Sequence, residues 1–356
     1  MHIVVIGGTG FIGYHLVNLL LQQKHQVTLL SRSPARAKSL FSDQVEVVQG
    51  DLSAPESIDY DTLFADADAL VYAAGIDERA EPEGDIYEFF HKENVITCIQ
   101  VIDQAKAHNV KQVVVLGSIF TYIDRTTPEL ELVNFHPYIR SRYEQQLQAL
   151  ALADNDFQVN VVEIPYVFGA APGCDSLWKS IIMYVRIGNP LVVTPGGANA
   201  ISVKTLALAI AGVLNHVEES GPVPVGDENI TWEQMLTRIS QQMQNKPRKV
   251  VCLPLGLFSE LTKIGAVFQD LLGMKSGLDQ HRIHEIITNE SFMDASEAKA
   301  LLHYSGGDLD EAFADTVHSC PKPTLKGVFN NAIDTLNNKT LDYLKKLDHR
   351  ANQSNT

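Results

Sequence analysis

The sequence predicts an α/β fold in which helices cover both faces of a parallel sheet and a smaller, mainly helical lobe follows. Three features support this: short apolar runs rich in β-branched residues, helical patterns between these runs, and a glycine-rich turn directly after the first run. Strands that are apolar throughout are typical of parallel sheets with both faces buried. Their alternation with helices predicts right-handed crossovers in a doubly wound sheet.

The first half of the chain carries this alternation. The apolar runs predict strands at residues 2–6, 26–31, 45–50, 69–75, 112–118 and 158–164. Apolar residues at helical spacing predict helices at residues 11–23, 86–108 and 137–153.

The rhythm changes after residue 169, where glycine and proline clusters begin. Beyond them we expect a helix at 203–217, a short strand at 221–226 and a helix that starts after Thr231, a good N-cap residue. The predicted domains are a sheet domain (1–168 and 201–226), a second lobe (169–200 and 227–322) and a tail (323–356).

The tail shows one apolar face over residues 325–347, which predicts a helix. Such a helix would dock either on its own lobe or on a second copy of the chain, so a homodimer is one of two interpretations.

Composition and charge argue against several classes of function. The 356 residues are 45% hydrophobic, and their formal net charge of −15 argues against binding to nucleic acid or to an anionic membrane. The longest apolar tract contains Glu260, Lys263 and Asp270, so no membrane span is expected. A strand begins at residue 2, which leaves no room for a signal peptide.

The cysteines and histidines suggest a compartment but no metal. Four cysteines lie far apart without a C-x-x-C pair, which favours a reducing, cytoplasmic setting. His281 and His284 share one helix face without an evident third ligand, so we expect no metal site.

The turn after the first strand has the spacing of a dinucleotide-binding loop. In VVIGGTGFIG, Gly7, Gly10 and Gly13 stand between a predicted strand and a predicted helix. One glycine allows a tight turn, another lets the backbone approach a pyrophosphate, and the third lets helix and strand pack closely. The free N–H groups of the helix N-terminus then face the phosphates. This context predicts a Rossmann-type dinucleotide site.

The end of the second strand indicates which dinucleotide binds. An acidic residue there would hold a ribose 2′-hydroxyl, but the segment reads LLSRSPARAK, with Arg32 close to the strand end. Arginine suits a 2′-phosphate through paired hydrogen bonds. NADP(H) is therefore favoured and NAD(H) stays open; a basic, solvated loop is the alternative interpretation.

Further motifs follow in a fixed order. They are GDL (50–52), AAG (73–75), the stretch from Asn94 to Ser118, PYIRSRYE (137–144), IPYVFG (164–169), VPVGDENITWEQML (223–236) and FMDASEAKALL (292–302). Together with the glycine loop, these motifs resemble the extended short-chain dehydrogenase/reductases, a family of NAD(P)-dependent epimerases and dehydratases. The resemblance covers roughly residues 2–322. The apolar tract 247–273 also loosely resembles the steroid-dehydrogenase-like and flavonol-reductase-like branches.

The resemblance implies a set of site residues. Ser118, Tyr138 and Arg142 match its catalytic positions, with Arg142 where the family has a lysine. The cofactor positions are Gly7, Thr9, Gly10, Phe11, Ile12, Gly13, Arg32, Asp51, Leu52, Ala73, Ala74, Gly75, Tyr138, Arg142, Pro165 and Val167. Phe120 and Tyr122 are expected on the site wall, and Asn94 is expected to tie backbone segments together. Glu163 stands where the family often has an arginine.

Arginine at position 142 keeps part of the lysine's chemistry. A tyrosine has a pKa near 10, so a neighbouring cation is needed to stabilise its anion. Arginine is cationic and has five donors, which suffices for the tyrosine and for a ribose. It does not readily release a proton, so a relay through the amine is lost. The sequence predicts an altered acid/base step rather than a clear loss of one.

Three functions follow from these residues. The first is an NAD(P)-dependent oxidoreductase or epimerase that transfers a hydride to or from an alcohol or ketone, with Tyr138 as acid/base. The second is a redox-silent dinucleotide-binding sensor or scaffold, which Arg142 leaves open. The third, an RNA-associated relative of the fold, disagrees with the net charge. We expect a small-molecule substrate and no nucleic-acid partner.

Overall fold

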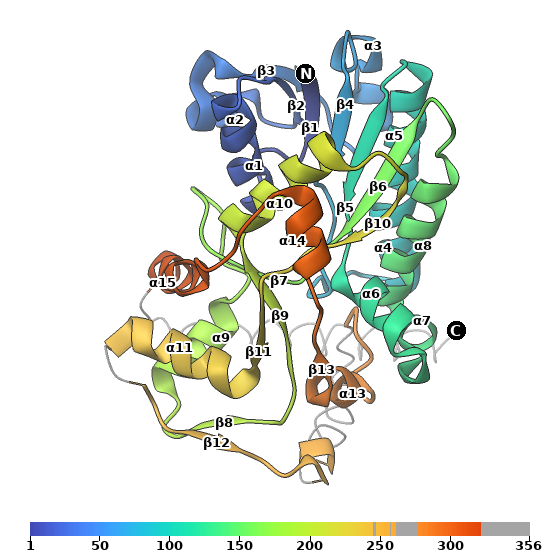
Figure 1. Ribbon diagram of the computed structural model, residues 1–356. Coiled ribbons are helices and arrows are strands. Elements are labelled where there is room, and N and C mark those ends of the chain that lie inside the picture. The colour runs from blue at the N-terminus through green and yellow to red at the C-terminus, as the bar shows by residue number, and fades with distance from the viewer. Residues whose placement is uncertain (245–246, 257, 261–275, 322–356) are drawn as a thin grey trace, which may run out of the picture.

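A computed structural model describes residues 1–244, 247–256, 258–260 and 276–321. Its largest feature is a seven-stranded sheet with strand order β10-β6-β5-β4-β1-β2-β3 (Figure 1). All six pairings in it are parallel, which confirms the doubly wound α/β fold. The strands are β1 (His2–Ile6), β2 (Gln26–Ser31), β3 (Glu46–Gln49), β4 (Ala69–Tyr72), β5 (Gln112–Leu116), β6 (Gln158–Glu163) and β10 (Gly221–Pro224).

Helices cover both faces of this sheet. Against one face, α1 (Phe11–Gln22), α2 (Pro34–Phe41) and α10 (Val203–His216) form an apolar core with residues such as Leu16 and Leu206. Against the other, α3 (Tyr60–Leu63), α5 (Thr97–Ala107) and α8 (Pro137–Ala151) form a second core. Figure 1 shows α1 and α10 on one side of the strands and α5 and α8 on the other.

Several predicted elements end early at the carboxyl edge of the sheet. The strands expected at 69–75 and 112–118 stop at Tyr72 and Leu116. Beyond these points the backbone leaves the sheet and lines a cleft, so residues 73–75 and 117–118 are loop. The helix expected at 86–108 consists of α4 (Ile86–Phe90), a π-helical stretch (His91–Ile96) and α5.

The second lobe contains strands that the sequence analysis did not predict. β9 (Gly197–Ser202) pairs with β7 (Tyr166–Phe168), β11 (Glu228–Thr231) and β13 (Glu290–Ser291). β8 (Leu191–Val193) pairs with β12 (Val250–Cys252). These strands are short and lie among glycines and prolines, so their periodicity is weak. The helices here are α9 (Lys179–Ile187), α11 (Trp232–Gln244), α13 (Ile283–Thr288), α14 (Ser296–Leu302) and α15 (Leu309–Ser319).

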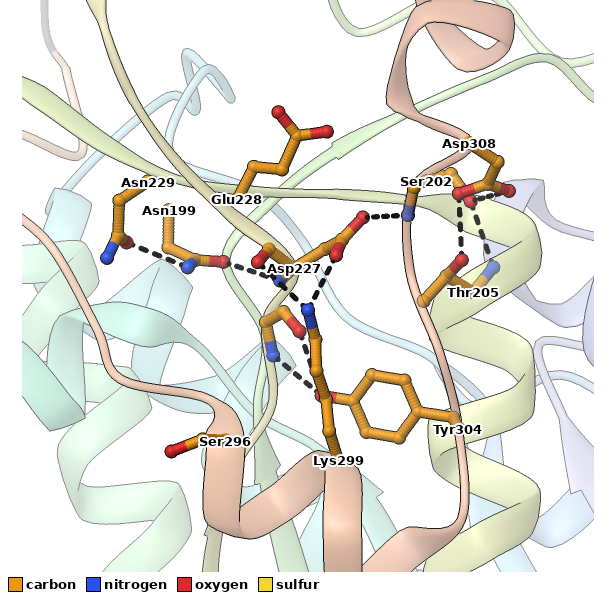
Figure 2. Close-up of polar contacts among 12 residues, drawn as sticks. Asn199, Ser202, Thr205, Asp227, Glu228, Asn229, Ser296, Lys299, Tyr304 and Asp308 are labelled. Atoms are coloured by element: carbon orange, nitrogen blue, oxygen red, sulfur yellow. Dashed lines mark hydrogen bonds and ion pairs between the residues drawn. The ribbon is translucent and has the colours of Figure 1, made fainter.

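A polar network joins the two late motifs, VPVGDENITWEQML and FMDASEAKALL (Figure 2). The Lys299 ammonium lies 2.7 Å from the Asp227 carboxylate and also donates to its carbonyl. The Tyr304 hydroxyl donates to the Gly226 carbonyl at 2.9 Å and accepts from its N–H. The backbone N–H of Asp227 in turn donates to Asn199 on β9. These motifs therefore hold α14 against β9 and β11.

Two predictions fall partly or wholly outside the described residues. They are the helix expected at 325–347 and most of the apolar tract 247–273. Within the described part of the chain, no helix has the length and apolar character needed to cross a membrane.

Two further helices lie next to the carboxyl edge of the sheet. α6 (Ile119–Thr126) follows β5, and α7 (Leu132–Phe135) leads into α8. Ser118 is the N-cap of α6, and Pro137 occupies the first turn of α8. The Ser118 cap and the first-turn Pro137 favour helix starts at these points, so Ser118 and Tyr138 lie at the N-terminal ends of α6 and α8.

Candidate functional site

The glycine loop has a backbone that side chains would not fit. Gly7 has a φ of +83°, and a Cβ there would lie 2.6 Å from the Ala73 carbonyl oxygen. A Cβ on Gly13 would lie 2.2 Å from the Gly7 carbonyl oxygen. No side chain caps the first turn of α1 and no acidic residue lies in it, so its N–H groups are available to an anion. The loop therefore fits a pyrophosphate.

Two cavities adjoin this loop. One, of about 570 Å³, is lined by Thr9, Arg32, Asp51 and Leu52 among others. The other, of about 550 Å³, is lined by residues that include Ser118, Tyr138 and Arg142. We call them the adenine-side cavity and the catalytic-side cavity. Both are lined by Gly7, Gly10, Ala73, Ala74 and Gly75, so they meet at the glycine loop. Every catalytic and cofactor position named from the sequence lines one or both of them.

The basic residues after β2 differ in their surroundings. Arg32 is exposed on the wall of the adenine-side cavity. Arg36 instead donates to backbone carbonyls of Thr9 and Gly173, at 3.3 and 3.1 Å. Its guanidinium thus links the glycine loop to the segment after β7. Arg32 is therefore the more available of the two arginines for a phosphate.

Tyr138 and Ser118 lie together in the catalytic-side cavity. Tyr138 is 6% exposed, and the rings of Phe90 and Phe120 pack edge-on against it, with centroids 5.5 and 6.3 Å away. Burial raises the pKa of Tyr138, while Arg142 and a hydrogen bond with Ser118 act in the opposite direction. At neutral pH the phenol therefore carries its proton. Ser118 also accepts from the Phe120 N–H at 3.4 Å, so it caps α6 as well.

Arg142 is buried one helical turn after Tyr138. Its guanidinium carbon lies 5.9 Å from the centre of the Tyr138 ring, and one nitrogen donates to the Leu116 carbonyl at 2.5 Å. A Cβ on Gly75 would lie 3.1 Å from another of its nitrogens. The guanidinium thus lies between the tyrosine, the end of β5 and the loop after β4, directly beside the cavity.

Asn94 ties two of these segments together. Its side chain exchanges hydrogen bonds with both backbone groups of Ile76, at 2.8 and 3.1 Å, and its amide donates to the Ser141 hydroxyl at 3.4 Å. The residue lies in the π-helical stretch, a type of turn that is frequent at functional sites. It therefore holds the loop after β4 against α8.

The glutamate at the unusual position 163 has a clear local role. Its carboxylate is fully buried and receives two hydrogen bonds from Arg125, both at 2.8 Å, and one from Thr121 at 2.9 Å. Glu163 thus joins α6 to β6 behind the site and does not line either cavity.

Of the two aromatic residues expected on the site wall, one lines the cavity and one does not. Phe120 lines the catalytic-side cavity, but Tyr122 does not, because its place on α6 turns it toward Arg125, whose guanidinium covers the ring at 5.6 Å. The sequence analysis missed Glu78, which lines the same cavity from the loop after β4, a segment that carries no motif. Tyr166 of the IPYVFG motif and Trp178 line this cavity as well.

Comparisons with known proteins agree with this geometry. A protein-family model described as NAD(P)H-binding matches residues 7–165. UDP-glucose 4-epimerase of Bacillus subtilis (strain 168) is 28% identical over 187 residues, which are 48% of this chain and 54% of that enzyme. The chain thus spans about half the length of this relative. A putative dihydroflavonol 4-reductase of Synechocystis sp. is 23% identical over 88% of this chain and 93% of its own length.

Solved structures share the fold over nearly the whole chain. The crystal structure of gox2253 has a TM-score of 0.71 at 20% identity and covers 89% of this chain and 97% of that one. UDP-glucuronic acid 4-epimerase from Bacillus cereus, in complex with NAD, has a TM-score of 0.64 at 14% identity, covering 90% and 98%. Residues 7–165 therefore match an NAD(P)H-binding domain, and the glycine loop, the sheet order and these relatives make the chain similar to the extended short-chain dehydrogenase/reductases.

Proposed function

We propose that this protein is an NAD(P)-dependent oxidoreductase that acts on an alcohol or ketone. One observation carries the proposal: a buried tyrosine, a serine and an arginine share a cavity with a glycine loop that fits a pyrophosphate. A tyrosine and serine beside a nicotinamide can hold and protonate one substrate oxygen. The epimerases among the relatives leave a transient oxidation, followed by reduction of the same carbon, as the second form of this chemistry.

The cofactor would lie across both cavities. The N–H groups at the start of α1 would hold the pyrophosphate, and Asp51 and Leu52 would border the adenine. Arg32 would pair with a 2′-phosphate, which is the reason to favour NADP(H) over NAD(H). When bound in the catalytic-side cavity, the nicotinamide supplies or accepts the hydride.

The residues of the chain would manage the proton. Tyr138 would donate its phenolic proton to the carbonyl oxygen of a ketone, and in the reverse direction it would take the proton of an alcohol. The Ser118 hydroxyl would hold the same oxygen within hydrogen-bond reach. Arg142 would stabilise the tyrosinate that remains and would donate to the nicotinamide ribose.

The raised pKa of Tyr138 means that the phenol would start as a proton donor at neutral pH. Because the phenol keeps its proton, it acts first as a general acid, which is the role that ketone reduction requires. Alcohol oxidation needs the tyrosinate and should therefore gain rate as the pH rises.

The compartment is part of the proposal. All four cysteines are free thiols, which supports a reducing cytoplasm.

The test is NADPH consumption with a panel of ketones and nucleotide sugars. Consumption that depends on the carbonyl compound and on Tyr138 supports the oxidoreductase. Tight NADPH binding without turnover of any of these compounds favours the redox-silent alternative. Absence of NAD(P)H binding contradicts both functions.

A further inference from the structure

Glu78 brings a carboxylate into the catalytic-side cavity that the mechanism above does not use. The residue lines this cavity together with Tyr138 and Arg142. Among the described residues, it has neither an ion pair nor a hydrogen bond to another side chain. Its neighbour Arg79 is bound elsewhere: it donates twice to Asp77, at 2.9 and 2.7 Å, and once to the Leu177 carbonyl. The charge of Glu78 is therefore left to act on whatever enters the cavity.

The backbone fixes Glu78 relative to the tyrosine. The Gly277 N–H donates to the Glu78 carbonyl at 3.2 Å, and the Gly277 carbonyl accepts from the Tyr138 N–H at 2.9 Å. A Cβ at position 277 would lie 2.8 Å from the Glu78 carbonyl oxygen and from the Phe90 ring. One glycine of the second lobe thus bridges the loop that carries Glu78 and the helix that carries Tyr138.

The electrostatics place Glu78 within range of the reacting groups. Burial raises the pKa of Glu78, and Asp77 adds to this, while Arg79 and Arg142 act against it. The Glu78 charge in turn contributes to the raised pKa values of Tyr138 and Tyr166. The Glu78 carboxylate is therefore close enough to affect the pKa of both tyrosines of the cavity.

The other described residues of the cavity wall offer few groups that would bind an anion. Its described walls are mainly apolar, with Ile76, Phe120, Ile164, Leu177 and Trp178 among them. The lysines and arginines on these walls are Arg79 and Arg142, and both are already hydrogen-bonded to protein groups. A diphosphate or carboxylate in such a cavity calls for charge-assisted donors. Here it would meet the Glu78 carboxylate instead.

Two arginines that could have served a diphosphate lie elsewhere. Arg186 donates to the carbonyls of Val317 and Cys320, at 3.2 and 2.8 Å. Arg282 pairs with Glu285 at 2.8 Å and covers the Phe135 ring. Neither lines the catalytic-side cavity.

We propose that Glu78 is a specificity-determining residue and that the substrate is an uncharged, largely apolar ketone or alcohol with a hydroxyl group near the reacting carbon. This rests on the proposed function. Glu78 accepts a hydrogen bond from that hydroxyl, the apolar walls hold the remainder, and the same carboxylate excludes nucleotide diphosphate sugars and carboxylates.

The test compares Glu78→Gln with wild type and with Glu81→Gln, which changes an exposed glutamate of the same loop that does not line the cavity. With NADPH, wild type should reduce 2-hydroxyacetophenone more efficiently than acetophenone. Glu78→Gln should reduce that preference by about tenfold or more, the loss of a hydrogen bond to a charged group. Glu81→Gln should leave it unchanged.

Binding gives a readout that does not require turnover. Calorimetry on the NADP-loaded protein should show weak or absent binding of benzoate and of UDP to wild type. Glu78→Gln should bind benzoate about fivefold or more tightly, because one repulsive charge is gone. Benzyl alcohol should not gain affinity in this variant.

Two results overturn the inference. One is saturable UDP binding with turnover of UDP-glucose by wild type. The other is benzoate binding that is equal in wild type and Glu78→Gln. In either case NADPH-dependent turnover of carbonyl compounds leaves the proposed function intact. Failure of the proposed function is recognised separately, by loss of NAD(P)H binding or of all turnover.

Discussion

The motifs of the sheet domain and the two late motifs of the second lobe lie in different surroundings. The glycine loop, AAG, Ser118 and two residues of PYIRSRYE, Tyr138 and Arg142, line one or both cavities. The late motifs contact each other instead, through Lys299, Asp227 and Tyr304 (Figure 2). We therefore expect the motifs of the sheet domain to serve ligand binding, whereas the late motifs hold α14 against β9 and β11.

Variants in the two sets of motifs should change different properties of the protein. Changes in the first set should reduce activity or cofactor affinity with little loss of stability. Changes in the second set should reduce the free energy of unfolding and leave NADPH affinity nearly unchanged. The four predictions below test this separation, from the largest expected effect to the smallest.

Replacing Tyr138 by phenylalanine should have the largest effect. The substitution keeps the ring, which packs between Phe90 and Phe120, and removes the group that transfers the proton. Turnover should fall about 10²- to 10⁴-fold, the usual contribution of a positioned acid/base group. NADPH affinity and the melting temperature should stay close to those of wild type. Retained turnover in this variant would show that the tyrosine is structural and would contradict its role as the acid/base group.

Replacing Lys299 by methionine should mainly change stability. Asp227 is only 3% exposed, so the substitution leaves a buried carboxylate without its cation. Breaking such a pair costs several kcal/mol when both partners are buried, but Lys299 is 30% exposed, so we expect a loss of about 2 kcal/mol in urea unfolding.

The matched control is Lys204→Met. Lys204 also forms an ion pair at 2.6 Å, with Glu311, but both side chains are about half or more exposed. This pair should contribute at most about 1 kcal/mol. If Lys299→Met instead lowered NADPH affinity while unfolding at the same urea concentration as wild type, the late motifs would belong to the site and the comparison would fail.

The glycine loop could be predicted from the sequence, whereas much of the cavity wall could not. A backbone conformation that only glycine can adopt is visible in the sequence. Gly7 and Gly13 stand where a Cβ would collide with carbonyl groups, so their spacing could be recognised. The wall of the catalytic-side cavity makes no such demand. Glu78, Tyr166 and Trp178 come from three separate segments, and any side chain of suitable size and polarity can occupy those positions. The same holds for the short strands of the second lobe, whose pairing with β9 depends on long-range contacts.

Replacing Arg32 by alanine should separate the two cofactors. The side chain is exposed on the adenine-side cavity, where a 2′-phosphate would lie. NADPH binding should weaken by about 1.5–3 kcal/mol, the range for a hydrogen bond to a charged group, and NADH binding should hardly change. Lys38→Ala is the control, since Lys38 is exposed on the following helix and does not line the cavity. Equal losses for both cofactors in fluorescence titrations would contradict a role in 2′-phosphate binding.

Replacing Arg142 by lysine should have the smallest effect on activity. Replacing it by methionine should have a larger effect, which changes how kcat depends on pH. Arg142 lowers the pKa of Tyr138, whereas burial, Glu78 and Asp77 raise it. Lysine restores a smaller cation at the same helical position, so ketone reduction should be retained within about tenfold of wild type.

Methionine removes the opposing cation, so the pKa of Tyr138 should rise further. The rise in the rate of alcohol oxidation with pH should then occur at higher pH, while ketone reduction near neutral pH keeps its protonated acid. The profiles of kcat for wild type, Arg142→Lys and Arg142→Met measure this shift. A profile that is identical in all three proteins would mean that residue 142 acts only by holding the Leu116 carbonyl and the loop at Gly75, and not on the proton of Tyr138.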